Sequence, residues 1–126
     1  MRRAFIIASA LKPQMAARAV SESPRSIDLV VVSPTAVARE AAAIALGGRC
    51  VYRVEEPLLA PRAPGESGRD VLVRLARVLR GLTAFEAEAP LVVLDALDVL
   101  AAGVFVLDEQ AVAHAVDDLE RLLPLS

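Results

Sequence analysis

The stretch that decides the fold is residues 28–46, which read DLVVVSPTAVAREAAAIAL. An apolar run at residues 29–32 is followed directly by Ser33 and Pro34, and then by a long alanine-rich segment. This pattern predicts a buried strand that passes into a helix. A serine hydroxyl accepts from an early helical N–H and proline suits the first helical position, so we expect Ser33 to cap a helix over residues 34–46. In α/β proteins such a junction is a common place for binding sites.

The rest of the chain repeats this alternation of strand and helix. Strands are expected at residues 4–8, 29–32, 50–54, 91–94 and 104–107. Helices are expected at residues 13–21 and 34–46. A third helix is expected to follow a capping box of Ser67 and Asp70, and a last helix to lie between Asp108 and Pro124. The alternation predicts a single α/β domain over residues 1–126, a three-layer sandwich whose mostly parallel sheet of about five strands has helices on both faces. Residues 95–102 are too few for an ordinary crossover, so we expect the last strand to pair antiparallel or at an edge.

Composition limits the classes of partner. The chain of 126 residues is 56% hydrophobic and 24% charged, which is typical of a globular domain. A net charge of −2 and an aromatic content of 3% argue against nucleic-acid binding. No apolar run approaches the roughly 20 residues that span a membrane. The mean hydropathy of +0.50 is high for so small a domain, so we expect apolar surface to be covered in a homodimer.

The first ten residues imitate a secretory signal peptide. Arg2 and Arg3 precede a short apolar run, which ends in Ala8-Ser9-Ala10. The run is at the shortest limit for such a signal, and a globular pattern begins immediately after it. We therefore expect a first buried strand here and a cytoplasmic protein.

Several motifs resemble those of one enzyme superfamily. Ser33-Pro34, followed by Ala38, Arg39, Glu40 and Ala42, resembles the SPxxRAxETA signature of the histidine phosphatases, the phosphoglycerate mutase-like proteins. Further similar segments are Ala4-Phe5-Ile6-Ile7, Leu11-Lys12-Pro13-Gln14, Pro64-Gly65-Glu66-Ser67 with Asp70-Val71 and Arg74-Leu75, and Leu91-Val92-Val93-Leu94. The resemblance covers most of residues 4–107 and implies a phosphoglycerate mutase-like fold.

The catalytic residues implied by the resemblance are missing. The family has a nucleophilic histidine within an Arg-His-Gly triplet, a second arginine in the Ser-Pro motif and a second histidine after the fourth strand. Here the triplet falls at Ala8-Ser9-Ala10, the second arginine at Val37 and the second histidine at or near Asp95. Val37 cannot donate to phosphate, and Asp95 would repel it. We expect Val37 to pack into the core and Asp95 to hold a nearby backbone N–H.

Arg39 is a candidate to replace the missing second arginine. It lies two residues beyond Val37, on a different side of the helix, so a surface or strand-end salt bridge is its expected role. The degenerate pocket positions are Ala8, Ser9, Ala10, Ser33, Val37, Arg39 and Asp95.

The remaining candidate residues give weaker evidence for a functional role. His114, the only histidine, precedes Asp117 and Asp118 on the last predicted helix and is expected to form a surface pair. Asp95 and Asp98 suit either Mg²⁺ or helix capping, and we expect no metal and no cofactor. Cys50, the single cysteine, is expected to be buried in a strand.

One further feature is a row of arginines on the third predicted helix. Arg74, Arg77 and Arg80 are expected to form a solvated stripe, with an acidic partner or anion as the alternative.

Two functions remain open. The first is a non-catalytic relative of the histidine phosphatases, a binding or assembly module with an unknown protein or small-molecule partner. The alternative is an enzyme or phosphate-ligand-binding protein whose pocket is rebuilt around Ser9, Ser33, Arg39 and Asp95. The missing catalytic groups favour the first. The expected homodimer contact is a sheet edge near Val104 or an alanine-rich helix face.

Overall fold

The computed structural model describes residues 4–23, 25–84, 86–95 and 104–108. The elements in chain order are β1 (Ala4–Ser9), α1 (Pro13–Glu22), β2 (Leu29–Val32), α2 (Ala36–Leu46), β3 (Arg53–Glu55), the short 3₁₀ helix η1 (Pro57–Leu59), α3 (Gly68–Thr83), β4 (Pro90–Leu94) and β5 (Val104–Asp108). The predicted last helix and His114 lie outside the described residues.

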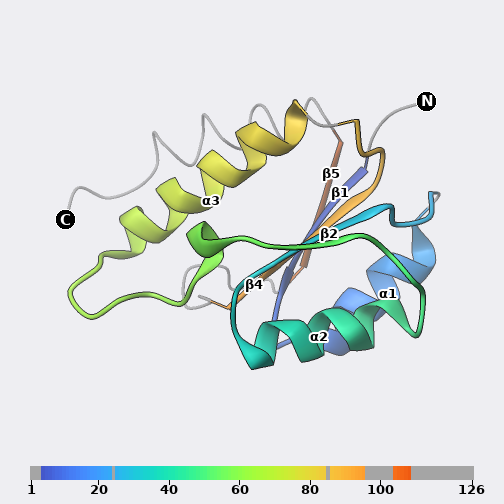
Figure 1. The fold of residues 1–126 in the computed structure, drawn as a ribbon, viewed down its shortest axis with the longest axis horizontal. Coiled ribbons are helices and arrows are strands. Elements are labelled where there is room, and N and C mark those ends of the chain that lie inside the picture. The colour runs from blue at the N-terminus through green and yellow to red at the C-terminus, as the bar shows by residue number, and fades with distance from the viewer. Residues whose placement is uncertain (1–3, 24, 85, 96–103, 109–126) are drawn as a thin grey trace.

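The sheet has the predicted α/β architecture. Its strand order is β3-β2-β4-β1-β5, with parallel pairing among the first four strands and antiparallel pairing between β1 and β5. Helices α1 and α2 cover one face and α3 covers the other (Figure 1), so the sheet is the middle of three layers. β5 is both antiparallel and at an edge, as the short connection before it predicts.

The two faces of the sheet are packed with side chains of different size. On β1, Phe5 and Ile7 face α3, whereas Ile6 and Ala8 face α1 and α2. On α3, Val71, Leu75, Val78 and Leu82 are all buried, and the last three pack against the sheet. The small residues Ala38, Ala41, Ala42 and Ala45 form the buried face of α2. Their small side chains allow that helix to approach the strands closely.

The start of α2 differs from the prediction. Thr35, not Ser33, is the N-cap, and its Oγ1 accepts from the Ala38 N–H at 3.1 Å. Ser33 instead follows β2 directly and extends its pairing with β4, because the Ser33 N–H donates to the Val93 carbonyl at 3.0 Å. The helix ends as expected at Gly47, which has a φ of 59°. By contrast, the predicted capping box of Ser67 and Asp70 is confirmed at the start of α3.

The third strand is shorter than predicted and begins later. It spans Arg53–Glu55, so Cys50 lies outside it and is exposed, which makes the prediction of a buried Cys50 wrong. The reason is the pairing register, which starts with Val30 opposite Arg53 and leaves residues 47–52 as the connection from α2. β3 is an edge strand, and all three of its residues are exposed.

Candidate functional site

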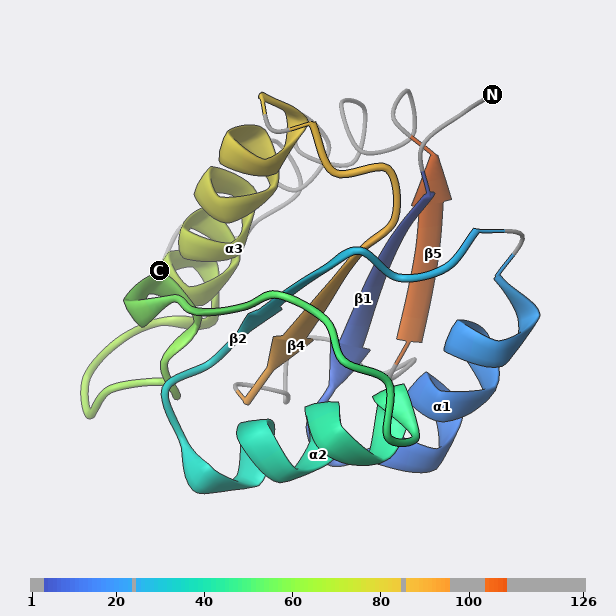
Figure 2. The same cartoon turned by 45° about the vertical axis from the view of Figure 1, so that its right-hand side comes forward.

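The carboxyl ends of β1, β2 and β4 lie at the same end of the sheet (Figure 2). Ser9 pairs with Leu94, and the Ala10 N–H donates to the Leu94 carbonyl at 2.7 Å. The Ser33 N–H donates to the neighbouring Val93 carbonyl. The structure therefore brings Ser9, Ala10 and Ser33 together at this edge, with Asp95 directly after β4. The connection from β1 to α1 consists of residues 10–12 only.

Both serines at this edge are buried, and their hydroxyl groups differ in their contacts. Ser9 is 4% exposed, and its Oγ accepts from the Leu11 N–H at 3.0 Å. Ser33 is fully buried, and its Oγ has no hydrogen-bond partner within the described part of the chain. A buried hydroxyl without a partner costs about 1–3 kcal/mol. Ser33 therefore places an unsatisfied polar group at the candidate site.

Val37 does not pack into the core, so that prediction is wrong. Its side chain is 49% exposed on the first turn of α2. The buried face of this helix begins one residue later, at Ala38, and continues through Ala41, Ala42 and Ala45. Because neighbours on a helix face are three or four residues apart, Val37 falls outside that face. The position to which the resemblance assigns a cation therefore carries an exposed apolar side chain.

Arg39 forms the predicted strand-end salt bridge. Its NH1 group lies 2.9 Å from Oε1 of Glu55, the last residue of β3. Both side chains are exposed, so the pair contributes little to stability. Its bond to Glu55 directs the Arg39 guanidinium to the end of β3.

Asp95 follows β4 and is partly buried. Among the described residues, no backbone N–H donates to its carboxylate as predicted. Residues 96–103, which follow it, lie outside the described residues. That hydrogen bond therefore stays a prediction, as does any role of Asp98.

An ion pair that the sequence did not predict anchors the long loop before α3. Arg74 donates from Nε and NH2 to the two Glu66 carboxylate oxygens at 2.9 and 2.7 Å. Its NH1 group donates to the carbonyls of Leu58 and Ala60 at 2.6 and 3.0 Å. The hydrogen bond from Arg74, followed by one from the Ala63 N–H, lowers the pKa of Glu66 below its ordinary value of 4.5. Arg74 thus ties η1 and the loop to α3.

This ion pair corrects the prediction of a solvated arginine stripe. Arg77 and Arg80 are exposed as expected, but the Arg74 side chain is only 19% exposed. Glu66 and Arg74 are eight residues apart, a spacing that does not indicate a pair within one helix. The available signal was that both residues occur in the segment 64–75, which resembles a family motif.

Comparisons with known proteins agree with this fold. No family model and no curated protein matches the chain. A crystal structure from Escherichia coli, assigned as an alpha-ribazole-5'-P phosphatase, is similar with a TM-score of 0.60 and 14% identity, over 79% of this chain and 76% of that one. A structure assigned as the phosphohistidine phosphatase SixA from Nakamurella multipartitia gives 0.51 and 18%, over 80% of this chain and 63% of that one.

Both neighbours are histidine phosphatase family members. The chain therefore has the α/β fold of these phosphatases, which confirms the predicted fold. It spans less than two thirds of the SixA structure. Identities of 14% and 18% establish likeness of fold alone.

Within the described residues, no cluster of three or more His, Cys, Asp or Glu residues is placed to hold a metal ion. None of the helices described is both long enough and apolar enough to cross a membrane.

Proposed function

We propose that the chain is a non-catalytic relative of the histidine phosphatases and acts as a binding or assembly module. The observation that carries the proposal is the set of side chains at the carboxyl edge of the sheet. By the resemblance, Ser9 falls at the position of the nucleophilic histidine and Val37 at that of the second arginine. Arg39, two residues beyond Val37, bonds Glu55.

The chemistry of phosphoryl transfer supports this assignment. A serine hydroxyl is a weak nucleophile without an adjacent base, and the chain's only histidine follows β5, not the carboxyl end of a parallel strand. Removing a single electrostatic donor typically lowers a rate by about 10²–10³. Both histidines and two arginines of the family pattern are missing here.

A second candidate function is binding of a phosphate-containing ligand in a rebuilt pocket. The supporting observation is the Ser33 hydroxyl, which is buried and unpartnered among the described residues and lies just before the N-terminus of α2. Helix N-termini favour anions. The carboxylate of Asp95 follows the adjacent strand and would oppose an anion, so we rank this function second.

The packing of β1 supports keeping this strand in the mature fold over its cleavage as part of a signal peptide. β1 lies between β4 and β5, and its residues from Phe5 to Ser9 are buried. Cleavage after Ala10, as in a signal peptide, would remove this strand from within the sheet. We therefore propose that residues 4–9 are kept in the mature fold.

The test incubates the purified full chain with p-nitrophenyl phosphate and with phosphoglycerates from about pH 5 to 8, the range in which an unperturbed histidine changes charge. We expect no turnover above a Ser9→Ala control. Turnover that persists through purification and disappears in Ser9→Ala or His114→Ala would overturn the proposal. A rise in melting temperature with inorganic phosphate that Ser33→Ala abolishes would instead support the second function.

A further inference from the structure

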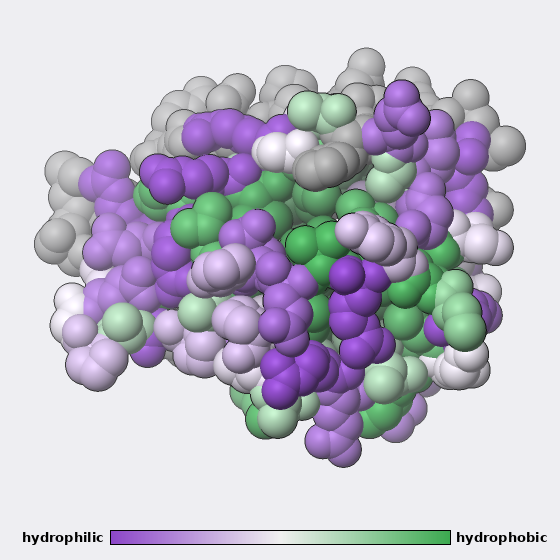
Figure 3. Space-filling view, viewed as in Figure 1, coloured by the Kyte–Doolittle hydropathy of each residue, from purple (hydrophilic) through white to green (hydrophobic). Residues whose placement is uncertain are grey.

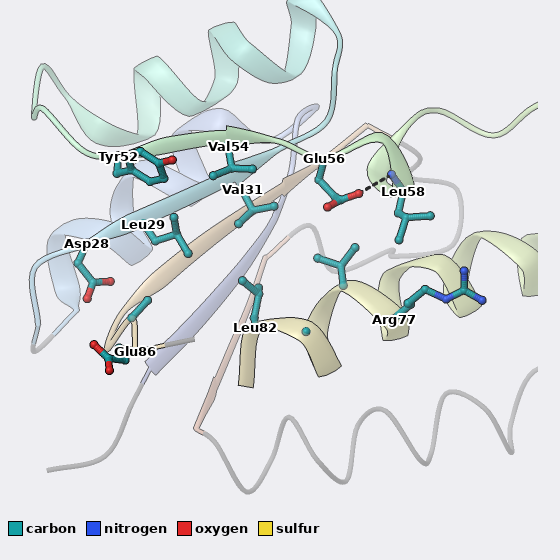
Figure 4. Close-up of a pocket in the computed structure, with 13 residues that line it drawn as sticks. Asp28, Leu29, Val31, Tyr52, Val54, Glu56, Leu58, Arg77, Leu82 and Glu86 are labelled. Atoms are coloured by element: carbon teal, nitrogen blue, oxygen red, sulfur yellow. Dashed lines mark hydrogen bonds between the residues drawn. The ribbon is translucent and has the colours of Figure 1, made fainter. Parts of the chain in front are cut away.

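An apolar groove lies on the face of the sheet that α3 covers, away from the candidate site. It has a volume of about 630 Å³ and runs between α3 and strands β2 and β3. Figure 3 shows hydrophobic residues gathered in a hollow with hydrophilic residues around it. In Figure 4, Val31 and Val54 point from the strands toward Leu82 of α3. None of the degenerate pocket positions lines this groove.

One wall of the groove is the open edge of the sheet. In a parallel pair, alternate residues turn both N–H and C=O toward the neighbouring strand. The Tyr52 carbonyl accepts from the Val30 N–H at 2.8 Å, and the Glu56 N–H donates to the Val32 carbonyl at 2.9 Å. The even-numbered residues of this segment therefore turn their backbone groups toward β2.

The odd-numbered residues of β3, Arg53 and Glu55, consequently turn their backbone groups away from the sheet. An edge strand of this kind is a template for pairing with another strand. An antiparallel copy related by a two-fold axis through Val54 would place Arg53 opposite Glu55 of the second copy, and Glu55 opposite its Arg53. Opposite residues exchange both backbone hydrogen bonds at such positions, and opposite charges there are favourable.

We propose that the chain forms a two-fold homodimer in which two β3 strands pair antiparallel around Val54 and join the two sheets. The sequence Arg53-Val54-Glu55 is its own charge complement in this arrangement. Glu55 then lies between Arg39 of its own chain and Arg53 of the second copy. This inference does not depend on whether the candidate site is catalytic.

The same pairing covers apolar surface. Val54 is 36% exposed and Tyr52 is 73% exposed, and both line the groove. Around the two-fold axis, Val54 meets Val54 of the second copy, so that the apolar faces of the two grooves become continuous. Burial of such a surface is the main favourable term in association.

The other sheet edge lacks these features. β5 has the sequence VFVLD, which contains no pair of opposite charges to set a register. Its residue Val106 is 59% exposed and serves as a matched control site for an edge substitution. The inference therefore replaces the predicted contact near Val104 with one at β3.

The experiment is sedimentation equilibrium of the full chain and its charge variants at micromolar concentration. We expect the wild type to sediment at about twice the mass of the 13.3 kDa chain. Arg53→Glu and Glu55→Arg each place like charges opposite one another at two positions, so each raises the dissociation constant of the dimer by about tenfold to a hundredfold. An equimolar mixture of the two variants restores opposite charges and should dimerise again.

Controls separate the interface from folding. Circular dichroism and melting temperature establish that each variant is folded, and Val106→Lys should leave the dimer unchanged. The proposal is wrong if the wild type sediments only as a 13.3 kDa species, if Val106→Lys dissociates the dimer, or if the mixture of variants stays monomeric. A monomeric wild type that binds an apolar fluorescent probe would also overturn it, because the groove would then take a small molecule.

Discussion

The anchored loop before α3 and the carboxyl edge of the sheet both hold polar side chains that are partly or fully buried. The two regions differ in whether these side chains have hydrogen-bond partners. In the loop, Arg74 makes four hydrogen bonds of 3.0 Å or less to Glu66, Leu58 and Ala60. At the carboxyl edge, Ser33 has a buried hydroxyl without a described partner.

This difference follows the two parts of the resemblance. Glu66 and Arg74 belong to a resembled motif and form a complete network that positions a loop. The resemblance places Ser9 and Val37 at positions that would contact phosphate. The fold that the resemblance implies is present, and the loss of its phosphate-binding groups is our proposal.

The largest expected effect is that of Arg74→Ala. It removes a charged donor from the Leu58 and Ala60 carbonyls, and hydrogen bonds to charged groups contribute about 1.5–3 kcal/mol. We expect the free energy of unfolding in urea to fall by at least that amount. Arg77→Ala, which removes an exposed arginine from the same helix, should change it by about 0.5 kcal/mol or less. Equal effects of the two substitutions would show that the loop is not anchored by Arg74.

A smaller effect is expected on the pH dependence of stability, because the pKa of Glu66 is lowered. Its folded-state pKa lies below the ordinary value of 4.5, so its contribution to stability is present above that pH and is lost as pH falls through the folded pKa. Glu66→Gln should therefore reduce the loss of stability between about pH 5 and 3. Urea midpoints across this range measure it, with Glu40→Gln as the variant that removes an exposed carboxylate. If the urea midpoints of the two variants change equally with pH, the ion pair of Glu66 and Arg74 is not formed in solution.

The smallest expected effect is that of Ser33→Ala. Removing a buried hydroxyl that has no partner should increase the free energy of unfolding by about 1 kcal/mol. Ser9→Ala should decrease it by about the same amount, because the Leu11 N–H loses its acceptor. Urea unfolding of both variants gives the comparison. A loss of stability in Ser33→Ala would mean that the hydroxyl has a partner and that the two regions are alike.

Local pattern by itself determined the elements and their order. The apolar runs before Ser9 and Ser33 predicted two strands of the sheet, and the Ser67/Asp70 capping box predicted the start of α3. The short connection before Val104 predicted an antiparallel or edge strand. These features depend on periodicity, capping and chain length, which act over a few residues and are readable from one chain.

Contacts between distant segments were decided only in the tertiary structure. The strand register made Ser33 a buried strand-end residue, left the cap to Thr35 and put Cys50 outside the sheet. The orientation of α2 against the sheet exposed Val37. Arg74 met Glu66 because the loop folds back onto α3. No local spacing encodes these contacts, because each one depends on where a remote segment is placed when the sheet and its helices pack.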